Sequence, residues 1–143
     1  MSTAIHRIVE ACRTGTHAPL IARLPSGWAV MGNSQFLLGY SLLLPDPVVP
    51  HLNVMQVESR TRFLADMARL GDAVLEVTSA LRINYSMFGN LEPALHAHVI
   101  PRFAHEADAL RTAHPWAYDW AAAPQFDSEI HGVVLRALQE RLR

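Results

Sequence analysis

The segment Ala94-Leu95-His96-Ala97-His98-Val99-Ile100 alternates two histidines with small and apolar residues. This period of two predicts a β-strand on which His96 and His98 share one face, their origins about 6.6 Å apart, while the residues between them face the core. Two imidazoles are costly to place on an otherwise apolar strand unless a polar group faces them. The pair therefore marks the candidate functional site of the chain.

The residues alone leave three interpretations of this pair open. His96 and His98 are a hydrogen-bonded pair without function, two ligands of a metal ion, or a nucleophile with a helper. No further Cys or His pair in the sequence completes a tetrahedral metal site, so we expect neither a metal nor a cofactor. The other six histidines are scattered and are expected at the solvated surface: His6, His17, His51, His105, His114 and His131.

The sequence around the pair predicts a β-hairpin. Residues 83–88 and 94–100 have strand patterns, residues 89–93 contain turn-forming Gly, Asn and Pro, and Pro101 is expected to end the second strand. Upstream, residues 20–44 contain short apolar runs separated by glycine and proline turns, which predicts two or three more strands.

Three other segments have the periodicity of amphipathic helices. The first covers residues of about 3–13 with Ser2 or Thr3 as N-cap, the second runs for about 22 residues from Glu58, and the third follows an Asp127 cap. Residues 102–126 show no clear period. The apolar stripes expected to be buried are Ile5, Ile8, Val9 and Cys12, then Phe63, Met67, Leu70, Val74, Val77 and Leu81, then Ile130, Val133, Val134, Ala137, Leu138 and Leu142.

These elements predict an α+β fold, an antiparallel sheet of about five strands with helices packed on one face. With 143 residues, half of them hydrophobic, the composition is that of one globular domain spanning residues 1–143. Cys12 is the single cysteine, which excludes an internal disulfide and every paired-cysteine metal or redox motif.

The charge of the chain favours a small partner. Twelve basic and 13 acidic residues give a formal net charge of −1, a balance that argues against nucleic acid or a membrane surface as the partner. All the cations are arginine, and the lack of lysine excludes P-loop, Schiff-base and lysyl-nucleotide chemistry. We see no signal peptide and no spanning segment, so we expect a cytoplasmic protein.

The segment Leu95-His96-Ala97-His98-Val99-Ile100-Pro101-Arg102 resembles the end of the signature of the histidine triad superfamily, His-φ-His-φ-His-φ-φ followed by Pro-Arg, where φ is apolar. Gly89-Asn90 stands where that family has Gly-Gln, and Asn84 lies near its upstream asparagine or glutamine. Residues 33–45 resemble the family's Pro-Gly-His-x-Leu-Val-x-Pro strand. The resemblance points to the fragile-histidine-triad-like and bacterial branch and implies that family's fold.

The resemblance also implies roles for the two histidines. His96 takes the middle triad position, which is the nucleophile in that family, and His98 takes the third, where it assists proton transfer to the leaving group. Ala94 stands in place of the first histidine, and Tyr40 stands where the family usually has the histidine of Gly-His. Two polar supports of the nucleophile are thus altered, while the Ala94 carbonyl remains available to hold one nitrogen of His96.

By the same resemblance, the ligand is a nucleotide. Asn33 is expected at a ribose hydroxyl, and Asn84 is expected among the residues that bind the nucleotide. Backbone N–H groups of the turn that starts at Gly89, the Asn90 amide and protonated His98 are the expected donors to the phosphate. The implied activity is hydrolysis or transfer at the α-phosphate of a nucleotide, dinucleotide or nucleoside phosphoramidate through a nucleotidyl-histidine. The alternative is a nucleotide-binding protein with little or no turnover. The family's usual homodimer, two sheets joined into one, is implied as well.

Overall fold

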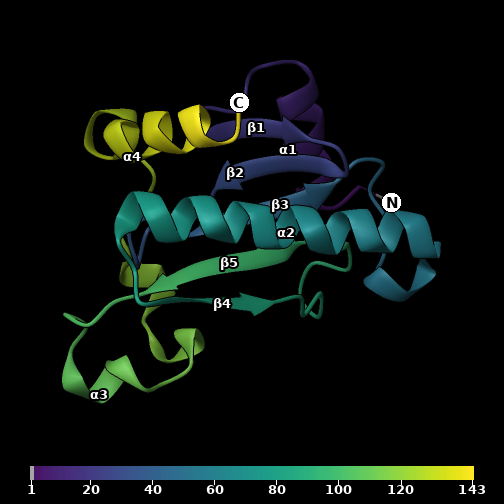
Figure 1. Ribbon diagram of the computed structural model, residues 1–143. Helices are drawn as coiled ribbons and strands as arrows, with labels where there is room; N and C mark the ends of the chain where they lie inside the picture. Colours follow the sequence, from purple (N-terminus) through teal and green to yellow (C-terminus); the bar gives the residue numbers. More distant parts are fainter. Residues whose placement is uncertain (1) are drawn as a thin grey trace.

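The computed structural model describes residues 2–143, and a five-stranded antiparallel sheet runs through its centre (Figure 1). The strands lie in the order β1-β2-β3-β5-β4, and every neighbouring pair is antiparallel. The predicted α+β class and strand number are confirmed. The strands are β1 (Leu20–Leu24), β2 (Gly27–Met31), β3 (Ser41–Pro45), β4 (Arg82–Ser86) and β5 (Ala97–Arg102).

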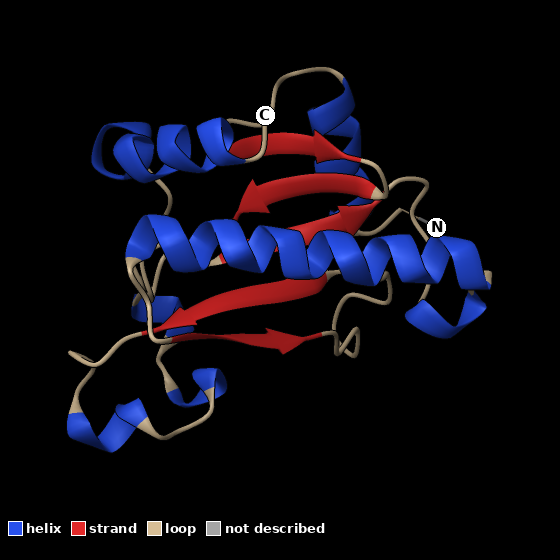
Figure 2. Ribbon diagram, viewed as in Figure 1, coloured by secondary structure: helices blue, strands red, loops and turns tan. Residues whose placement is uncertain are grey.

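The two longest helices, α2 (Val57–Thr78) and α4 (Ser128–Arg141), cover one face of this sheet (Figures 1 and 2). α2 has the predicted length of 22 residues and starts one residue earlier than predicted. Asp127 caps α4 as predicted, because its side chain accepts hydrogen bonds from two backbone N–H groups of the first turn. The main core lies between these helices and the sheet, and includes Leu24, Ala29, Leu43, Phe63, Leu70, Val74, Ala97, Val99 and Leu138.

The N-terminal helix α1 (Ala4–Arg13) lies on the opposite face (Figure 1), so only the two long helices share one face. Alternation along β2 explains how both faces are filled, since Ala29 packs toward α2 while Val30 packs toward α1. Thr3 caps the helix in a reciprocal capping box with His6. The α1 cluster consists of Ile5, Val9, Cys12, Val30, Leu44 and Ala94.

Residues 103–126 form a covering segment with three short helices, α3 (Asp108–Arg111), η2 (Pro115–Ala117) and η3 (Trp120–Ala122). Another short helix, η1 (Leu52–Val54), precedes α2. A buried ion pair holds the covering segment to β5, because Arg102 Nη2 donates to Glu106 Oε1 over 3.0 Å and Tyr118 donates to the same oxygen over 2.5 Å. The segment is therefore ordered by polar contacts that no periodicity reveals.

The second strand of the hairpin is shifted from its prediction. β5 begins at Ala97, so His96 lies just before it, and Pro101 is inside the strand instead of ending it. Pairing of β5 to β3 stops at Val99, so the strand has a single partner at Pro101, where a residue without N–H is tolerated. The connection between β4 and β5, residues 87–96, is longer than the predicted turn.

The predicted burial or exposure of four residues was wrong. Leu81 is exposed because α2 ends at Thr78, where Ser79 turns left-handed. Ile130 and Val133 are 72% and 70% exposed, because α4 packs through the neighbouring stripe of His131, Leu135 and Leu138. His131 is consequently buried, and its Nδ1 accepts from the Asp127 N–H over 2.9 Å. Within the described residues, no helix has both the length and the apolar composition needed to span a membrane.

Candidate active site

His96 and His98 lie side by side on the face of the sheet that carries the covering segment. Their ring centroids are 4.9 Å apart with planes at 70°. Leu95, Ala97 and Val99 are buried in the main core, so the predicted alternation between the two faces is confirmed. Both rings are half-buried, which leaves part of each accessible to a ligand.

The orientation of His96 is fixed by the backbone. Its Nδ1 lies 2.7 Å from the carbonyl oxygen of Ala94, two residues earlier. Because a carbonyl only accepts, Nδ1 carries the hydrogen, and the lone pair of the neutral ring is on Nε2. The side chain of Ala94 belongs to the α1 cluster and is 1% exposed, so the first triad position faces apolar contacts beneath α1.

The orientation of His98 is fixed by Tyr40, whose hydroxyl lies 2.7 Å from His98 Nδ1. The Tyr40 side chain is buried and lies against Gly32, where an added Cβ would stand 2.2 Å from its ring. Burial raises the pKa of Tyr40, so the phenol keeps its proton. Among the described residues this hydroxyl has no other hydrogen-bond partner, so we infer that it donates to Nδ1 and that His98 Nε2 carries the hydrogen.

His98 is neutral at pH 7. Burial, reinforced by the charge of a protonated His96 nearby, lowers the pKa of His98 to about 4. The structure therefore differs from the expectation of a protonated His98, because burial desolvates the ring. In the neutral tautomer that the Ala94 carbonyl selects, His96 presents the lone pair of Nε2 beside an uncharged N–H on His98.

A cavity of about 470 Å³ opens over these two rings, a volume typical of sites for small organic ligands. Gly89 and Asn90 line it with the histidines, so these four predicted residues are brought together. Gly89 has a φ of +66°, which allows the loop to turn sharply beside His96. The cavity is lined by Phe88, Gly89, Asn90, Leu91, Glu92, His96, His98, Trp116 and Trp120.

Sequence reasoning missed the aromatic wall of this cavity. The Trp116 ring lies 5.0 Å from the His98 ring at 89°, and the Trp120 ring lies 5.0 Å from that of Trp116. Both tryptophans come from the covering segment, where the clustering of large aromatic side chains with prolines was the available signal. Ser86, paired with His98 across the sheet, is a second omission, because its hydroxyl is buried without a partner among the described residues.

Asn33 and Asn84 do not line the cavity over the histidines. Asn33 is exposed after β2, and its carbonyl accepts from the Phe126 N–H over 2.7 Å. The Asn84 side chain accepts from Arg102 Nη1 over 2.9 Å. Apolar residues of the first strands, Trp28, Val30 and Leu42, pack against α1. Within the described residues, no group of three His, Cys, Asp or Glu side chains is arranged to hold a metal ion.

The whole chain matches solved structures of histidine triad proteins. A histidine triad protein from Marinobacter aquaeolei matches with a TM-score of 0.76 and 17% identity, over 99% of this chain and 97% of that one. A histidine triad protein from Bradyrhizobium japonicum matches with a TM-score of 0.73 and 20% identity, over 87% and 90% of the two chains.

The chain has the histidine triad fold. A third match, to a hypothetical histidine triad nucleotide-binding protein from Sulfolobus tokodaii, has a TM-score of 0.73 and 11% identity over 94% of this chain and 90% of that one. No protein-family model and no curated protein matches the sequence. At these identities the histidine triad fold is what the structures share, and the chemistry has to be argued from the site itself.

Proposed function

We propose that this chain is a histidine triad protein that binds a nucleotide and cleaves it at the α-phosphate, with His96 as nucleophile. One observation carries the proposal: the Ala94 carbonyl binds His96 Nδ1, so the lone pair is on Nε2, in a ring that lines a ligand-sized cavity. A neutral imidazole of this kind attacks phosphorus without prior loss of a proton. The nucleotide-binding function named for the Sulfolobus protein is consistent with this ligand.

The reaction would proceed in two displacements. His96 Nε2 forms a bond to the α-phosphorus while the bond to the leaving group breaks, and the leaving group takes the electron pair and a proton from water. Water then attacks the nucleotidyl-histidine, releases the nucleoside monophosphate and restores the imidazole. His98 Nε2–H and donors of the Gly89-Asn90 turn hydrogen bond to the phosphoryl oxygens, where negative charge develops.

The lining of the cavity favours an uncharged leaving group. It contains no arginine, and its one charged side chain, Glu92, has an oxygen 3.2 Å from the Ala4 N–H. Within this cavity a polyphosphate leaving group would therefore meet no cation, whereas Phe88, Leu91 and Trp116 offer apolar surface. We propose that nucleoside monophosphate esters or amidates with apolar leaving groups are cleaved faster than dinucleoside polyphosphates.

The test is His96-dependent turnover. The wild-type protein should release AMP from a fluorogenic adenosine phosphoramidate faster than from diadenosine polyphosphates. His96→Ala should lower kcat/KM by at least about 10³-fold, as expected when a nucleophile is removed. His105→Ala, an exposed histidine outside this cavity, is the matched control and should retain activity. Mass spectrometry of a slow substrate's intermediate should locate the nucleotidyl group on the peptide that contains His96. Equal turnover by His96→Ala would refute the nucleophile.

The second candidate is a nucleotide-binding protein without turnover. It is favoured by the same lack of a cation around the two rings, since developing negative charge is then met by neutral donors alone. This candidate predicts saturable AMP binding that His98→Ala weakens, together with no AMP release from any substrate.

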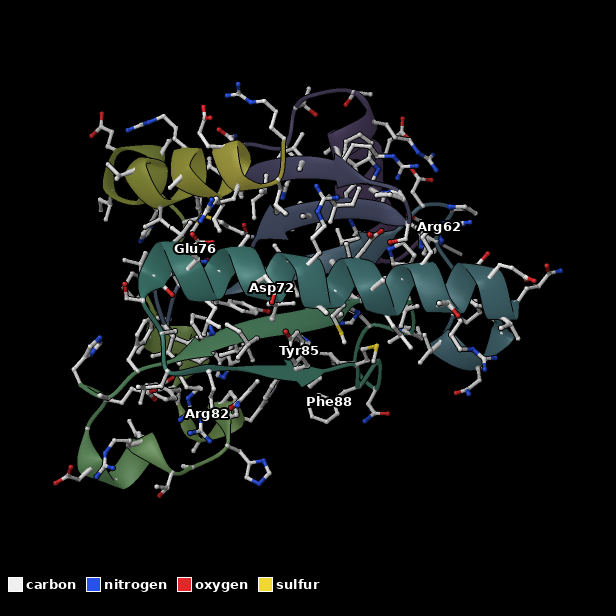
Figure 3. All side chains as sticks on the ribbon, viewed as in Figure 1. Arg62, Asp72, Glu76, Arg82, Tyr85 and Phe88 are labelled. Carbon is white, nitrogen blue, oxygen red and sulfur yellow. The ribbon has the colours of Figure 1, made fainter. Side chains whose placement is uncertain are left out.

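We also propose a homodimer joined through β4. This strand pairs with β5 on one side, and its other edge has no partner among the described residues. Tyr85 and Phe88, labelled in Figure 3, are 42% and 58% exposed at this edge. An unpaired edge bearing exposed aromatic groups is a template for strand addition. Light scattering after size exclusion should give twice the chain mass, and Tyr85→Lys should shift it toward the monomer.

A cytoplasmic location stays a prediction.

A further inference from the structure

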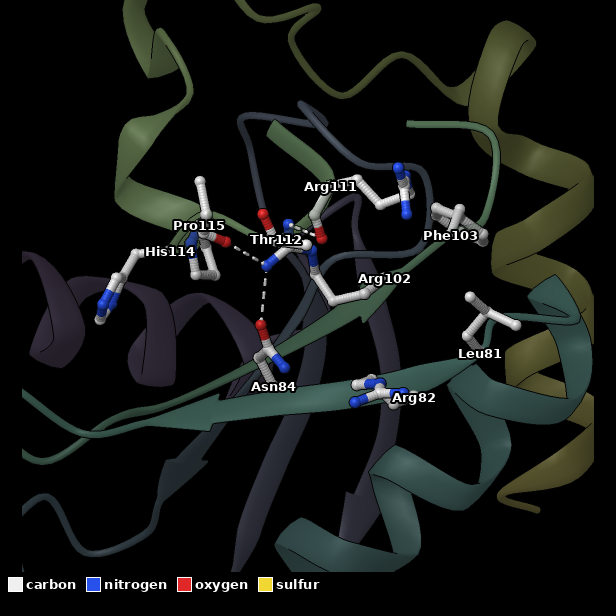
Figure 4. Close-up of a pocket in the computed structure, with 10 residues that line it drawn as sticks. Leu81, Arg82, Asn84, Arg102, Phe103, Arg111, Thr112, His114 and Pro115 are labelled. Atoms are coloured by element: carbon white, nitrogen blue, oxygen red, sulfur yellow. Dashed lines mark hydrogen bonds between the residues drawn. The ribbon is translucent and has the colours of Figure 1, made fainter. Parts of the chain in front are cut away.

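A second cavity, of about 520 Å³, lies at the far end of the β4-β5 hairpin (Figure 4). Cross-strand partners point to the same face of a sheet, so Arg82 and Arg102 share the face of Ser86 and His98. Arg102 follows His98 by four positions along the strand, which places the two ends of this face about 13 Å apart. Pro115 lines the far cavity and Trp116 the cavity over His98, so the covering segment divides the face into two chambers.

The far chamber is basic. Of its ten lining residues three are arginine and one is histidine, and none is Asp or Glu. Three of the chain's 12 basic residues therefore meet in one chamber of a protein whose formal net charge is −1. The lining consists of Leu81, Arg82, Asn84, Arg102, Phe103, Arg111, Thr112, Ala113, His114 and Pro115.

The three arginines differ in how far their charge is compensated. Arg102 is buried, paired with Glu106, and also donates to the carbonyls of Ala113 and Leu110 over 2.8 Å. Its charge is therefore compensated, and its role is structural. Arg111 has an exposed partner, Asp108, at 3.3 Å, a kind of pair that contributes little. The Arg82 guanidinium makes no hydrogen bond or ion pair with a described residue, although the Arg82 backbone pairs with β5. The chamber thus carries uncompensated positive charge.

The neutral polar groups of the chamber are donors as well. A guanidinium only donates, so the Asn84 oxygen must face Arg102, and the Asn84 amide nitrogen is turned away from Arg102, on the side of Arg82 (Figure 4). Thr112, which carries a hydroxyl, also lines the chamber. Guanidinium groups with additional N–H and O–H donors match the several acceptor oxygens of a phosphate group.

We propose that this chamber binds the phosphate group of a small organic phosphate, at a site separate from the α-phosphate site at His96. The chamber is larger than a bare phosphate needs, and Leu81, Phe103 and Pro115 give it apolar wall for an organic part. The phosphate belongs either to an independent ligand or to the distant end of a molecule whose other end is at His96. The site does not depend on the chemistry proposed for His96.

Calorimetric titration with inorganic phosphate, AMP and diadenosine tetraphosphate tests the site. Arg82→Ala/Arg111→Ala should weaken binding of at least one probe tenfold or more, with a salt dependence that the variant loses. Both side chains are exposed, so the variant should fold, and thermal unfolding checks this. Arg7→Ala/Arg69→Ala removes the same charge from exposed arginines elsewhere and should bind like the wild type.

His98→Ala distinguishes the two sources of the phosphate. If inorganic phosphate and AMP still bind in His98→Ala and respond to the arginine pair, the ligand is independent. If only the binding of diadenosine tetraphosphate is affected, and both His98→Ala and the arginine variant weaken it, one molecule spans the two chambers. The proposal is overturned if the arginine variant binds every probe within twofold of the wild type, or if no probe shows saturable binding. Neither result bears on turnover at His96.

Discussion

The two walls of the cavity over His98 have different origins in the sequence. The strand wall, residues 94–98, is built from local alternation, with His96 held by a carbonyl only two residues away. The covering wall, Trp116 and Trp120, is held in place by Arg102, Glu106 and Tyr118, whose contacts join distant turns of the chain. The local alternation of residue types therefore positions the two histidines, and the buried polar contacts of the covering segment position the tryptophans that enclose them.

Breaking the covering wall should have the largest effect on stability. Glu106 accepts from Arg102, from Tyr118 and from the Phe103 N–H over 2.6 Å, and Glu106→Ala would leave Arg102 buried without a countercharge. We expect a loss of about 3–5 kcal/mol in the free energy of unfolding, measured by urea denaturation followed through tryptophan fluorescence. Glu140→Ala, an exposed carboxylate on α4, is the control.

A pH effect accompanies this prediction. Burial alone would raise the pKa of Glu106, but its bonds from Arg102, Tyr118 and Phe103 outweigh burial and lower it. A depressed carboxyl pKa contributes stability above its unfolded value that is lost as the pH falls through the folded value. Stability of the wild type should therefore fall in acid, below a pH of about 4. A loss under 1 kcal/mol for Glu106→Ala would show that the cover is held by apolar contacts instead.

The strand wall can be probed at the first triad position. Ala94 is 1% exposed among apolar residues beneath α1, so Ala94→His would force a polar ring into a filled space. We expect a loss of about 1–3 kcal/mol in the free energy of unfolding and no gain in turnover. The control is Ala68→His on the exposed side of α2. A stable variant with faster turnover would mean that α1 yields and that the family's first histidine can be restored here.

Periodicity predicted the strand wall and the sheet because their contacts repeat at fixed spacing. Leu95, Ala97 and Val99 alternate with the histidines, and α2 shows the expected stripe, so both could be read from apolar positions alone. The covering wall could not, because Arg102 and Glu106 are charged residues that sequence patterns assign to the surface. The same limit applies to Asn84, which was expected to bind the nucleotide because it lies near a motif; its contact with Arg102, through the side-chain oxygen, could not be read from that position.

His98 lies in the strand wall and its ring packs against Trp116 of the covering wall, so its protonation depends on both walls. Its pKa is lowered to about 4, so between that value and about 6.5 the unfolded chain binds a proton that the folded chain does not. The free energy of unfolding should therefore decrease as the pH falls through this window. We expect His98 to contribute on the order of 2 kcal/mol to that decrease. This is less than the full pKa shift would give, because the ring is partly exposed and solvent screens its charge.

Comparing the variants His98→Asn and His114→Asn tests this assignment. Denaturation at pH 7 and pH 5 should show a smaller pH dependence in His98→Asn, while His114→Asn, an exposed histidine, should behave like the wild type. If the free energy of unfolding depends on pH in both variants as it does in the wild type, the pH dependence comes from a group other than His98.

The smallest expected effect concerns the hydrogen bond from Tyr40, which directly precedes β3, to His98 Nδ1 in the strand wall. Tyr40→Phe removes that donor but keeps the ring against Gly32, so stability should fall by only about 1 kcal/mol. Turnover should fall roughly tenfold, mainly in kcat, because His98 is no longer held as the Nε2–H form. Tyr85→Phe, an exposed tyrosine, is the control. The nitrogen-15 spectrum of the wild type should show Nδ1 of His98 unprotonated. A protonated Nδ1 would reverse the direction of the bond and with it the role of His98 as a donor toward the phosphoryl oxygens.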